Sequence, residues 1–185
     1  MEPGIDIEIV ASNAPIDLKR READIAVRSF RPTQSELIAK KIKDAAARLY
    51  ATPQYLERIG NPTSPHGLGK ADFIGFDSTD ALLNALNAFG FNLTQRNFPV
   101  LTESHLVLWE LVKHGVGVGL MAEDIGDAEP MVQRALPNLE PMRFPIWLVA
   151  HRELNTSRRI SMVFDLLATE LSDDGPTRPA TPQYP

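Results

Sequence analysis

The last third of this chain constrains its fold most, because a glycine-punctuated apolar run, a strand and an amphipathic helix follow one another there. The run from Gly115 to Leu120 ends a helical pattern, and glycine ends helices readily because it tolerates left-handed backbone angles. Residues 145–151 predict a strand, and residues 157–171 carry apolar side chains at the spacing of one buried helix face. Strand–helix units without a catalytic constellation predict an α/β module that binds a ligand, rather than an enzyme.

The composition is that of an ordinary globular protein. With 185 residues, 43% of them hydrophobic and 23% charged, the chain is long enough to bury roughly 70% of its unfolded surface. No apolar run reaches the ~18 residues of a membrane span, the N-terminus lacks the pattern of a signal peptide, and there is no cysteine for disulfides or thiolate metal sites. We therefore expect a cytoplasmic protein without a membrane partner.

The charge distribution argues against nucleic acid as a direct partner. The net charge is −5, and the basic groups at residues 19–21 and 40–43 stand beside acidic residues. Binding to DNA needs several Lys or Arg side chains that converge on phosphates. We expect no direct nucleic-acid contact by this chain.

The first 52 residues predict mainly strands. Ile5, Ile7 and Ile9 alternate with acidic residues, which is the period of a half-buried strand. A helical turn or two is expected at residues 16–21, after a proline. Further strands are expected at residues 25–27, fully buried, and at 37–42 and 46–50.

The middle of the chain alternates helices and strands. Thr52 and Pro53 have the residue types of a helix N-cap and first helical position. The other elements expected are a loop at 61–70, strands at 72–76 and 98–101, a helix that Ser78 or Thr79 caps and Gly90 ends, a helix at 104–114, a helical turn at 122–125, and a final helix that Asn155 or Thr156 caps.

This alternation predicts mostly parallel sheets covered by helices. Residues 53–144 contain their own strand–helix units, and the strand at 145–151 is expected to return to the sheet that the first residues begin. The predicted organisation is lobe I (residues 1–52 and 145–172), lobe II (residues 53–144) and a polar, proline-rich disordered tail (residues 173–185). A cleft between two lobes is a usual place for a small ligand.

Four segments in a specific order and spacing resemble one known family. They are residues 22–28 (EADIAVR), 49–56 (LYATPQYL), 112–120 (VKHGVGVGL) and 147–152 (WLVAHR). Together they resemble the effector-binding, or substrate-binding, domain of LysR-type transcriptional regulators, over about residues 3–172. The resemblance implies an α/β, two-lobed periplasmic-binding-protein-like fold of type 2 with an inducer in its cleft.

Compared with the family pattern, the sequence begins late. It shows no winged helix-turn-helix, no linker helix, and no counterpart of the first strand and first helix of the effector domain, so we expect an N-terminally truncated version. Losing about four buried apolar side chains removes ~6–12 kcal/mol, against ~5–15 kcal/mol for a whole domain. We expect a marginal or aggregation-prone chain, or one that a partner strand completes at an open sheet edge.

The candidate effector-binding residues come from strand ends and from the resemblance. Carboxyl ends of parallel strands face the crevice in such folds, and helix N-termini attract carboxylates. In the family, the position of Ser12 and Asn13 and the segment at Gly119 and Leu120 face the cleft. The predicted set is Ser12, Asn13, Phe76, Ser78, Thr102, Ser104, Gly119 and Leu120. Helix capping is the alternative role for the polar members, and apolar packing for Gly119 and Leu120.

The sequence gives little evidence for a catalytic site, a metal site or a cofactor site. Asp77 and Glu103 are conceivable as paired carboxylates, but no matched nucleophile or metal accompanies them. The four histidines lack metal-ligand spacing, and the glycine run at 115–119 lacks the dinucleotide-binding spacing. We expect no enzyme, no metal site and no cofactor.

The predicted function is that of an effector-sensing domain that modulates DNA-dependent transcription. The effector would be a small organic acid or an aromatic metabolite, by analogy, and it would act by shifting a population of lobe or dimer arrangements. Expected partners are further copies in a homo-oligomer or a full-length LysR-type chain. Two alternatives stay open: a truncated regulator that acts through hetero-oligomerisation, and a periplasmic-type solute-binding protein of a transporter.

Overall fold

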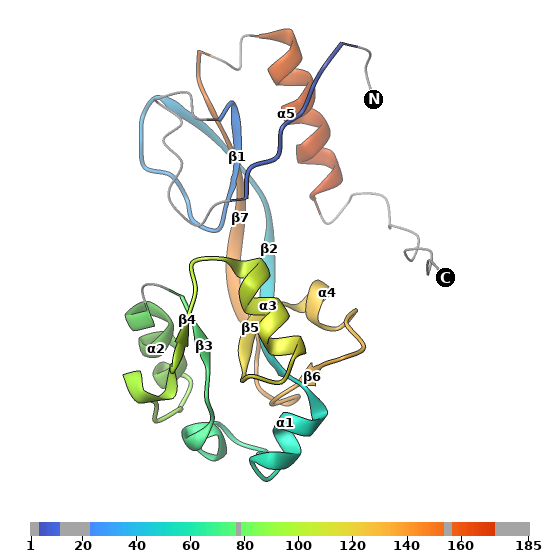
Figure 1. Cartoon of the computed structure of the whole chain (residues 1–185). Helices are drawn as coiled ribbons and strands as arrows, with labels where there is room; N and C mark the ends of the chain where they lie inside the picture. Colours follow the sequence, from blue (N-terminus) through green and yellow to red (C-terminus); the bar gives the residue numbers. More distant parts are fainter. Residues whose placement is uncertain (1–3, 12–22, 77–78, 154–156, 173–185) are drawn as a thin grey trace, which may run out of the picture. The chain divides into compact units, whose positions relative to one another are not determined.

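The computed structural model describes residues 4–11, 23–76, 79–153 and 157–172 (Figure 1). The chain divides into unit 1 (Met1–Ala45 and Phe144–Pro185) and unit 2 (Ala46–Arg143). The strands are β1 (Ile25–Arg28), β2 (Leu37–Ala51), β3 (Ile74–Gly75), β4 (Val100–Leu101), β5 (Gly119–Ala122), β6 (Gln133–Arg134) and β7 (Met142–His151). The helices are α1 (Pro53–Arg58), α2 (Thr79–Ala88), α3 (His105–Lys113), α4 (Glu123–Gly126) and α5 (Arg158–Glu170), with 3-10 helices η2 (Pro65–Lys70) and η3 (Gln95–Asn97).

The larger sheet contains antiparallel pairs, and the expectation of mostly parallel sheets was wrong. Its strand order is β1–β7–β2–β5, with β6 also paired to β2. The pairs β1–β7, β2–β5 and β2–β6 are antiparallel, whereas β3 and β4 pair in parallel. The alternation of strands and helices along a chain does not decide which strands become neighbours, and here β1 pairs with β7, the last strand among the described residues.

One long strand, β2, replaces the two strands expected at residues 37–42 and 46–50. The charged residues Lys40, Lys41 and Asp44 are exposed on it, and Lys41 Nζ lies 2.8 Å from Asp44 Oδ2. Charged side chains can point to solvent without interrupting a strand, and there is no glycine or proline between Leu37 and Pro53. The expected loop at 61–70 likewise contains a regular element, η2.

The N-terminal strand expected at residues 5–9 is not formed. Residues 5–11 have no regular secondary structure, and Ile9 is 89% exposed. β1 is a strand as predicted, but it is not fully buried: Val27 is 55% exposed, because β1 lies at the end of the strand order. An extended segment becomes a stable strand only beside a partner that takes its backbone hydrogen bonds.

Several predictions fall on residues outside the described part of the chain. These are the helical turn at 16–21, the caps Asn155 and Thr156, and the tail at 173–185. α5 begins after Ser157, which makes no side-chain capping hydrogen bond. No helix of the described residues has the length and apolar character needed to cross a bilayer.

Unit 1 packs α5 against β7. Phe164 of α5 belongs to one apolar cluster with Leu148 and Ala150 of β7. Val149, which points to the opposite face of the same strand, packs with Leu37 of β2.

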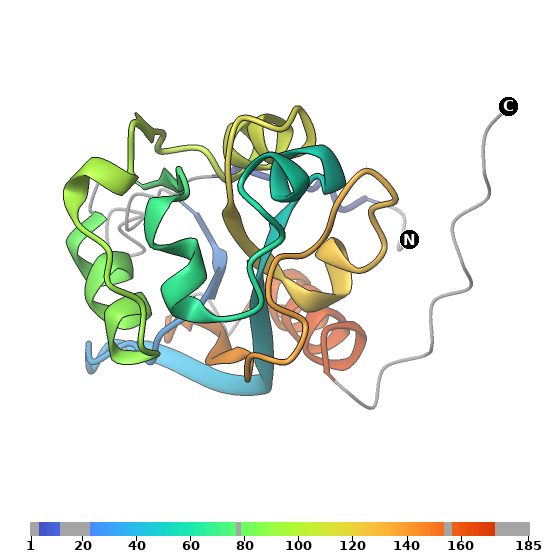
Figure 2. The same ribbon diagram turned by 90° about the horizontal axis from the view of Figure 1, so that it is seen from below.

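Unit 2 has two apolar clusters, and the alternation of its strands assigns neighbouring residues to different clusters. Leu49 and Phe73 belong to the first, whereas Tyr50 and Ile74 belong to the second, with Val112 of α3. In both views α2 and α4 lie on opposite sides of this unit (Figures 1 and 2).

The helix boundaries in unit 2 follow the predicted signals. Thr52 Oγ1 accepts a hydrogen bond from Tyr55 N at 3.2 Å, and Pro53 stands at the first turn of α1, as predicted. Gly90 follows α2 with φ 87° and Gly115 follows α3 with φ 69°, angles that favour glycine.

Tyr50 organises the second cluster of unit 2. Its side chain is fully buried, and its ring meets Trp109 edge to face with centroids 5.9 Å apart. The Tyr50 hydroxyl donates to Asp127 Oδ1 at 2.9 Å. Burial, together with this bond, raises the pKa of Tyr50 to about 12, so the hydroxyl stays protonated and remains a donor.

An arginine–carboxylate network continues from Asp127. Arg134 bonds both Asp127 and Glu123, and Arg48 Nε lies 2.8 Å from Glu123 Oε1. The hydrogen bond from Arg134 holds the pKa of Asp127 below its usual range. The network ties α4 to β2 and β6 with its charges paired, which is the expected state of partly buried ions.

We predict that Gly126→Ala destabilises the protein. A Cβ at Gly126 would lie 2.2–2.7 Å from three ring atoms of Tyr50, too close for a fully buried ring to accommodate without a shift. The free energy of unfolding should fall by about 1–3 kcal/mol, as measured by urea denaturation. Gly69→Ala is the matched control, because a Cβ there meets nothing within 4 Å; equal losses in the two variants would contradict the prediction.

We also predict that Thr52→Ala weakens the start of α1. Removal of the capping oxygen leaves the Tyr55 N–H without its acceptor and should cost about 1 kcal/mol in the same measurement. Thr52→Ser retains the oxygen and should recover most of the loss. Ser157→Ala, at a cap position without a side-chain hydrogen bond, should be close to neutral.

Candidate functional site

Two of the predicted residues, Phe76 and Thr102, follow neighbouring parallel strands. In the β3–β4 pair, Gly75 lies opposite Leu101, so Phe76 and Thr102 both leave the sheet at its carboxyl edge. Thr102 N donates to Gly75 O at 3.0 Å, which fixes the two strand ends to each other. In open α/β sheets this edge is where ligands bind.

A third predicted residue, Ser104, joins them through the start of α3. Ser104 N donates to Thr102 Oγ1 at 3.1 Å, and Ser104 Oγ accepts from Val107 N at 3.4 Å as the N-cap. The capping role that the sequence offered as an alternative is therefore present for Ser104. A hydroxyl that accepts a backbone bond still has a proton to donate, so Thr102 and Ser104 keep a donor each at this edge.

His105 is a neighbour of this group that the sequence reasoning missed. Its ring lies 4.2 Å, centroid to centroid, from that of Phe76, at an interplanar angle of 59°. The residue as a whole is exposed, but the partial removal of water from its ring lowers the pKa of His105. The neutral imidazole, favoured at pH 7, offers one donor and one acceptor. Its position directly after a helix-capping serine was the available signal, whereas the sequence analysis considered the histidines only as metal ligands.

The structure places Gly119 within the packing of α3. A Cβ there would lie 2.4 Å from Val112 Cγ2 and 3.1 Å from Leu108 Cδ2. Glycine is required because the helix packs directly on the backbone of β5. The apolar-packing alternative thus accounts for Gly119.

Leu120 and Phe76 pack against different clusters. Leu120 packs against the cluster of Leu49, whereas Phe76 packs against the cluster of Tyr50. Successive positions of a strand face opposite sides, so Leu120 faces the side of β5 opposite to the α3 contact at Gly119. The structure brings together Phe76, Thr102 and Ser104 but not Leu120.

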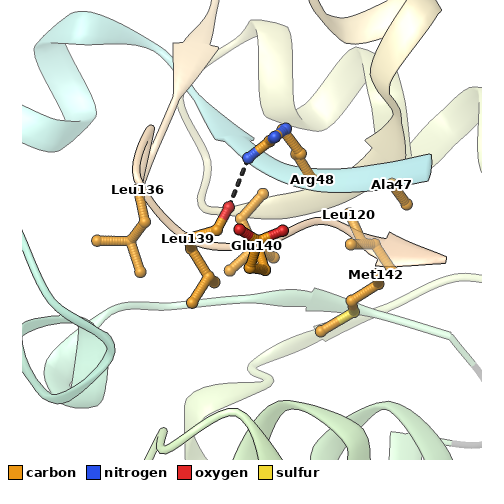
Figure 3. A pocket seen from close by; sticks show the side chains of 8 residues that line it. Ala47, Arg48, Leu120, Leu136, Leu139, Glu140 and Met142 are labelled. Carbon is orange, nitrogen blue, oxygen red and sulfur yellow. Dashed lines mark hydrogen bonds between the residues drawn. The ribbon is translucent and has the colours of Figure 1, made fainter.

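Leu120 instead lines a small hollow of unit 2 (Figure 3). The hollow is bounded mainly by apolar side chains: Ala47, Leu49, Leu120, Leu136, Leu139 and Met142, with Arg48 and Glu140. Arg48 Nη1 donates to Leu139 O at 2.5 Å across one side. Its free volume of about 10 Å³ is the room of about one water molecule, too small for an organic effector.

The other predicted residues, Ser12, Asn13 and Ser78, lie outside the described part of the chain. Within that part, no three His, Asp or Glu side chains are grouped in a way that could hold a metal ion. At the carboxyl edge of β3 and β4, the described residues present two rings (Phe76 and His105), two hydroxyls (Thr102 and Ser104) and the N-terminus of α3. That arrangement can bind a small polar or aromatic molecule.

Comparison with known proteins gives the family. The family model for the LysR substrate binding domain matches residues 1–172. The HTH-type transcriptional regulator CrgA of Neisseria meningitidis serogroup C is 25% identical over 182 residues, which cover 93% of this chain and 59% of CrgA. The chain thus spans about three-fifths of the length of this curated relative.

Similarity to solved structures supports the same family assignment. The regulatory domain of CrgA from Neisseria meningitidis has a TM-score of 0.72 at 25% identity, covering 85% of this chain and 79% of that domain. The regulatory domain of CcmR from Synechocystis, solved in complex with 2-PG, has a TM-score of 0.66 at 12% identity, covering 86% and 78%, and it supports the fold alone. The predicted fold class, α/β and periplasmic-binding-protein-like of type 2, is confirmed, and the chain belongs to the LysR substrate-binding domain family.

Proposed function

We propose that this chain senses a small-molecule effector as part of a LysR-type transcriptional regulator, with the effector bound at the carboxyl edge of β3 and β4. The family membership supports this proposal, as do curated relatives that are transcriptional regulators rather than enzymes. A domain of the same fold has been solved with a bound small molecule.

The observation that carries the proposal is the convergence of Phe76, Thr102, Ser104 and His105. Parallel pairing brings the two strand ends together, and the capping bonds fix the hydroxyls. The Phe76 and His105 rings offer aromatic surface, while the hydroxyls and the start of α3 favour oxygen acceptors. The matching ligand is an organic acid or an aromatic metabolite.

Effector binding would act through a difference in affinity. A ligand that binds two arrangements of the regulator equally well shifts nothing, and a tenfold preference shifts the equilibrium by about 1.4 kcal/mol. Allosteric coupling typically amounts to about 1–3 kcal/mol. An effector on this edge therefore needs to distinguish the arrangements by no more than tenfold to a hundredfold.

The regulator would act in the cytoplasm, as a homo-oligomer or together with a full-length LysR-type chain. The cytoplasmic location is supported by the relatives, which are transcriptional regulators and so act on DNA. The net charge of −5 supports the view that this chain itself makes no direct contact with nucleic acid, so operator contacts would belong to other parts of the regulator.

We predict that Phe76→Ala weakens effector binding at least tenfold. Calorimetric titration with a panel of organic acids and aromatic metabolites identifies a ligand of the unaltered chain first, and the variants are then compared with that ligand. Loss of the Phe76 ring removes the aromatic surface and frees the His105 ring. Thr102→Val should weaken binding as well, and Thr102→Ser should restore it, because serine keeps both the donor and the acceptor for Ser104 N.

Leu101→Ala is the control for a general effect on the strand end. Leu101 is 51% exposed and adjoins Thr102, so its truncation should leave the affinity within about twofold. Circular dichroism checks that every variant is folded. Equal affinities of the Phe76→Ala and Leu101→Ala variants would place the effector elsewhere on the protein.

A further inference from the structure

Among the described residues, one buried side-chain polar atom lacks a hydrogen-bond partner, the indole Nε1 of Trp147 in β7. Buried polar atoms are almost always hydrogen-bonded, because an N–H group that leaves water without finding an acceptor loses free energy. An indole N–H can only donate a hydrogen bond. The partner that would satisfy Trp147 is therefore an acceptor.

Trp147 lies on the face of β7 opposite to α5. Its neighbour Leu148 belongs to the cluster of α5, whereas Trp147 packs against the cluster of Leu37 and Val149. β7 pairs with β1 (Figure 1), and Arg28 stands opposite Trp147 in the register. The indole N–H thus lies in mainly apolar surroundings, where a hydrogen bond to a charged group is stronger than in water.

Arg31 supplies a positive charge at the same place. Its guanidinium carbon lies 5.6 Å from the centroid of the Trp147 ring, which is a cation–π contact. Arg31 is exposed, and no carboxylate of the described residues forms an ion pair with it. A guanidinium over a ring keeps the N–H groups of its own plane for an acceptor, so two kinds of donor meet here.

A carboxylate matches both donors. It carries one negative charge and two acceptor oxygens, so one oxygen can accept from the indole N–H and the other from the guanidinium. A neutral carbonyl would satisfy the indole and leave the charge of Arg31 unpaired. Phe30, which is 52% exposed and lies under the Arg28 guanidinium, offers apolar surface for a short hydrocarbon tail.

We propose that Arg31 and the indole N–H of Trp147 form a binding site for a small organic carboxylate in unit 1. The long, exposed side chain of Arg31 can move to admit the carboxylate to the buried N–H. β3 and β4, which carry the proposed effector edge, belong to unit 2. The two proposals therefore stand on different residues, and either can fail without the other.

The test uses the isotopically labelled full chain and two probes of similar size, butyrate and its neutral amide, butyramide. The chain has two tryptophans, so its NMR spectrum shows two indole N–H signals, which the Trp147→Phe variant assigns. Butyrate should shift the Trp147 signal to a plateau and leave the Trp109 signal in place. Butyramide and sodium chloride should move neither. The absence of a saturating shift with butyrate, or an equal shift with butyramide, would overturn the proposal.

Substitution of Arg31 tests the charged donor. Arg31→Gln should weaken butyrate binding about tenfold, because it removes a charge-assisted hydrogen bond. Arg31→Lys keeps the charge without the planar fork and should lose less. Arg159→Gln makes the same change of charge at an exposed position of α5 and should leave the affinity unchanged. Equal weakening by the two glutamine variants would show general attraction to positive charge and would refute the site.

Trp147→Phe tests the indole donor, because it keeps a ring beside Arg31 and removes the N–H. Saturation of the backbone amide shifts in β1 and β7 should then need about tenfold more butyrate. An unchanged affinity of this variant would exclude the indole from the site. The dispersion of the amide signals checks that the variant is folded, and the comparison of butyrate with butyramide on the unaltered chain needs no variant.

Discussion

The burial of Tyr50 is the interaction on which unit 2 depends, because one residue joins four elements to β2. Its backbone pairs with Gly119 of β5 and with Arg134 of β6, and its ring packs on Trp109 of α3. The ring also lies where any side chain at Gly126 would stand, and its hydroxyl bonds Asp127. A ring enclosed on all sides cannot move without displacing α3 and α4, since protein interiors are close-packed.

The candidate site takes its geometry from that packing. α3 rests on the glycine backbone of β5 at Gly119 through Leu108 and Val112, and this contact holds the helix against the strand. Ser104 and His105 stand at that beginning, beside the strand ends that carry Phe76 and Thr102. The hydroxyls that cap and brace the helix are the same ones that can donate to a ligand. Stability and binding therefore share atoms at this edge, and a ligand there would find donors whose positions are already fixed, which lowers the ordering cost of binding.

Unit 1 contrasts with this close packing. α5 packs on one face of β7, and on the other face Val149 packs beside Leu37 of the neighbouring strand β2. In contrast, β1 and the segment at residues 5–10 keep large apolar side chains in water. The alternation from Ile5 to Ile9 predicted a half-buried strand, but the structure forms no strand there. Alternation is a local property, whereas a strand exists only through a neighbour that the segment itself does not contain.

The features that the sequence by itself determined are local. They are the helix caps at Thr52 and Ser104, the helix ends at Gly90 and Gly115, and the apolar faces of the longer helices. Hydrogen bonds and backbone angles within a few residues decide these features. The four-segment resemblance also identified the family. Only the tertiary structure decided that residues 37–51 form one strand, that the larger sheet contains antiparallel pairs, and that Leu120 and Phe76 pack against different clusters. It also brought His105 against Phe76 and closed the network around Asp127. Most of these features join residues separated by tens of positions, and the packing of the whole unit, rather than any local signal, selects such partners.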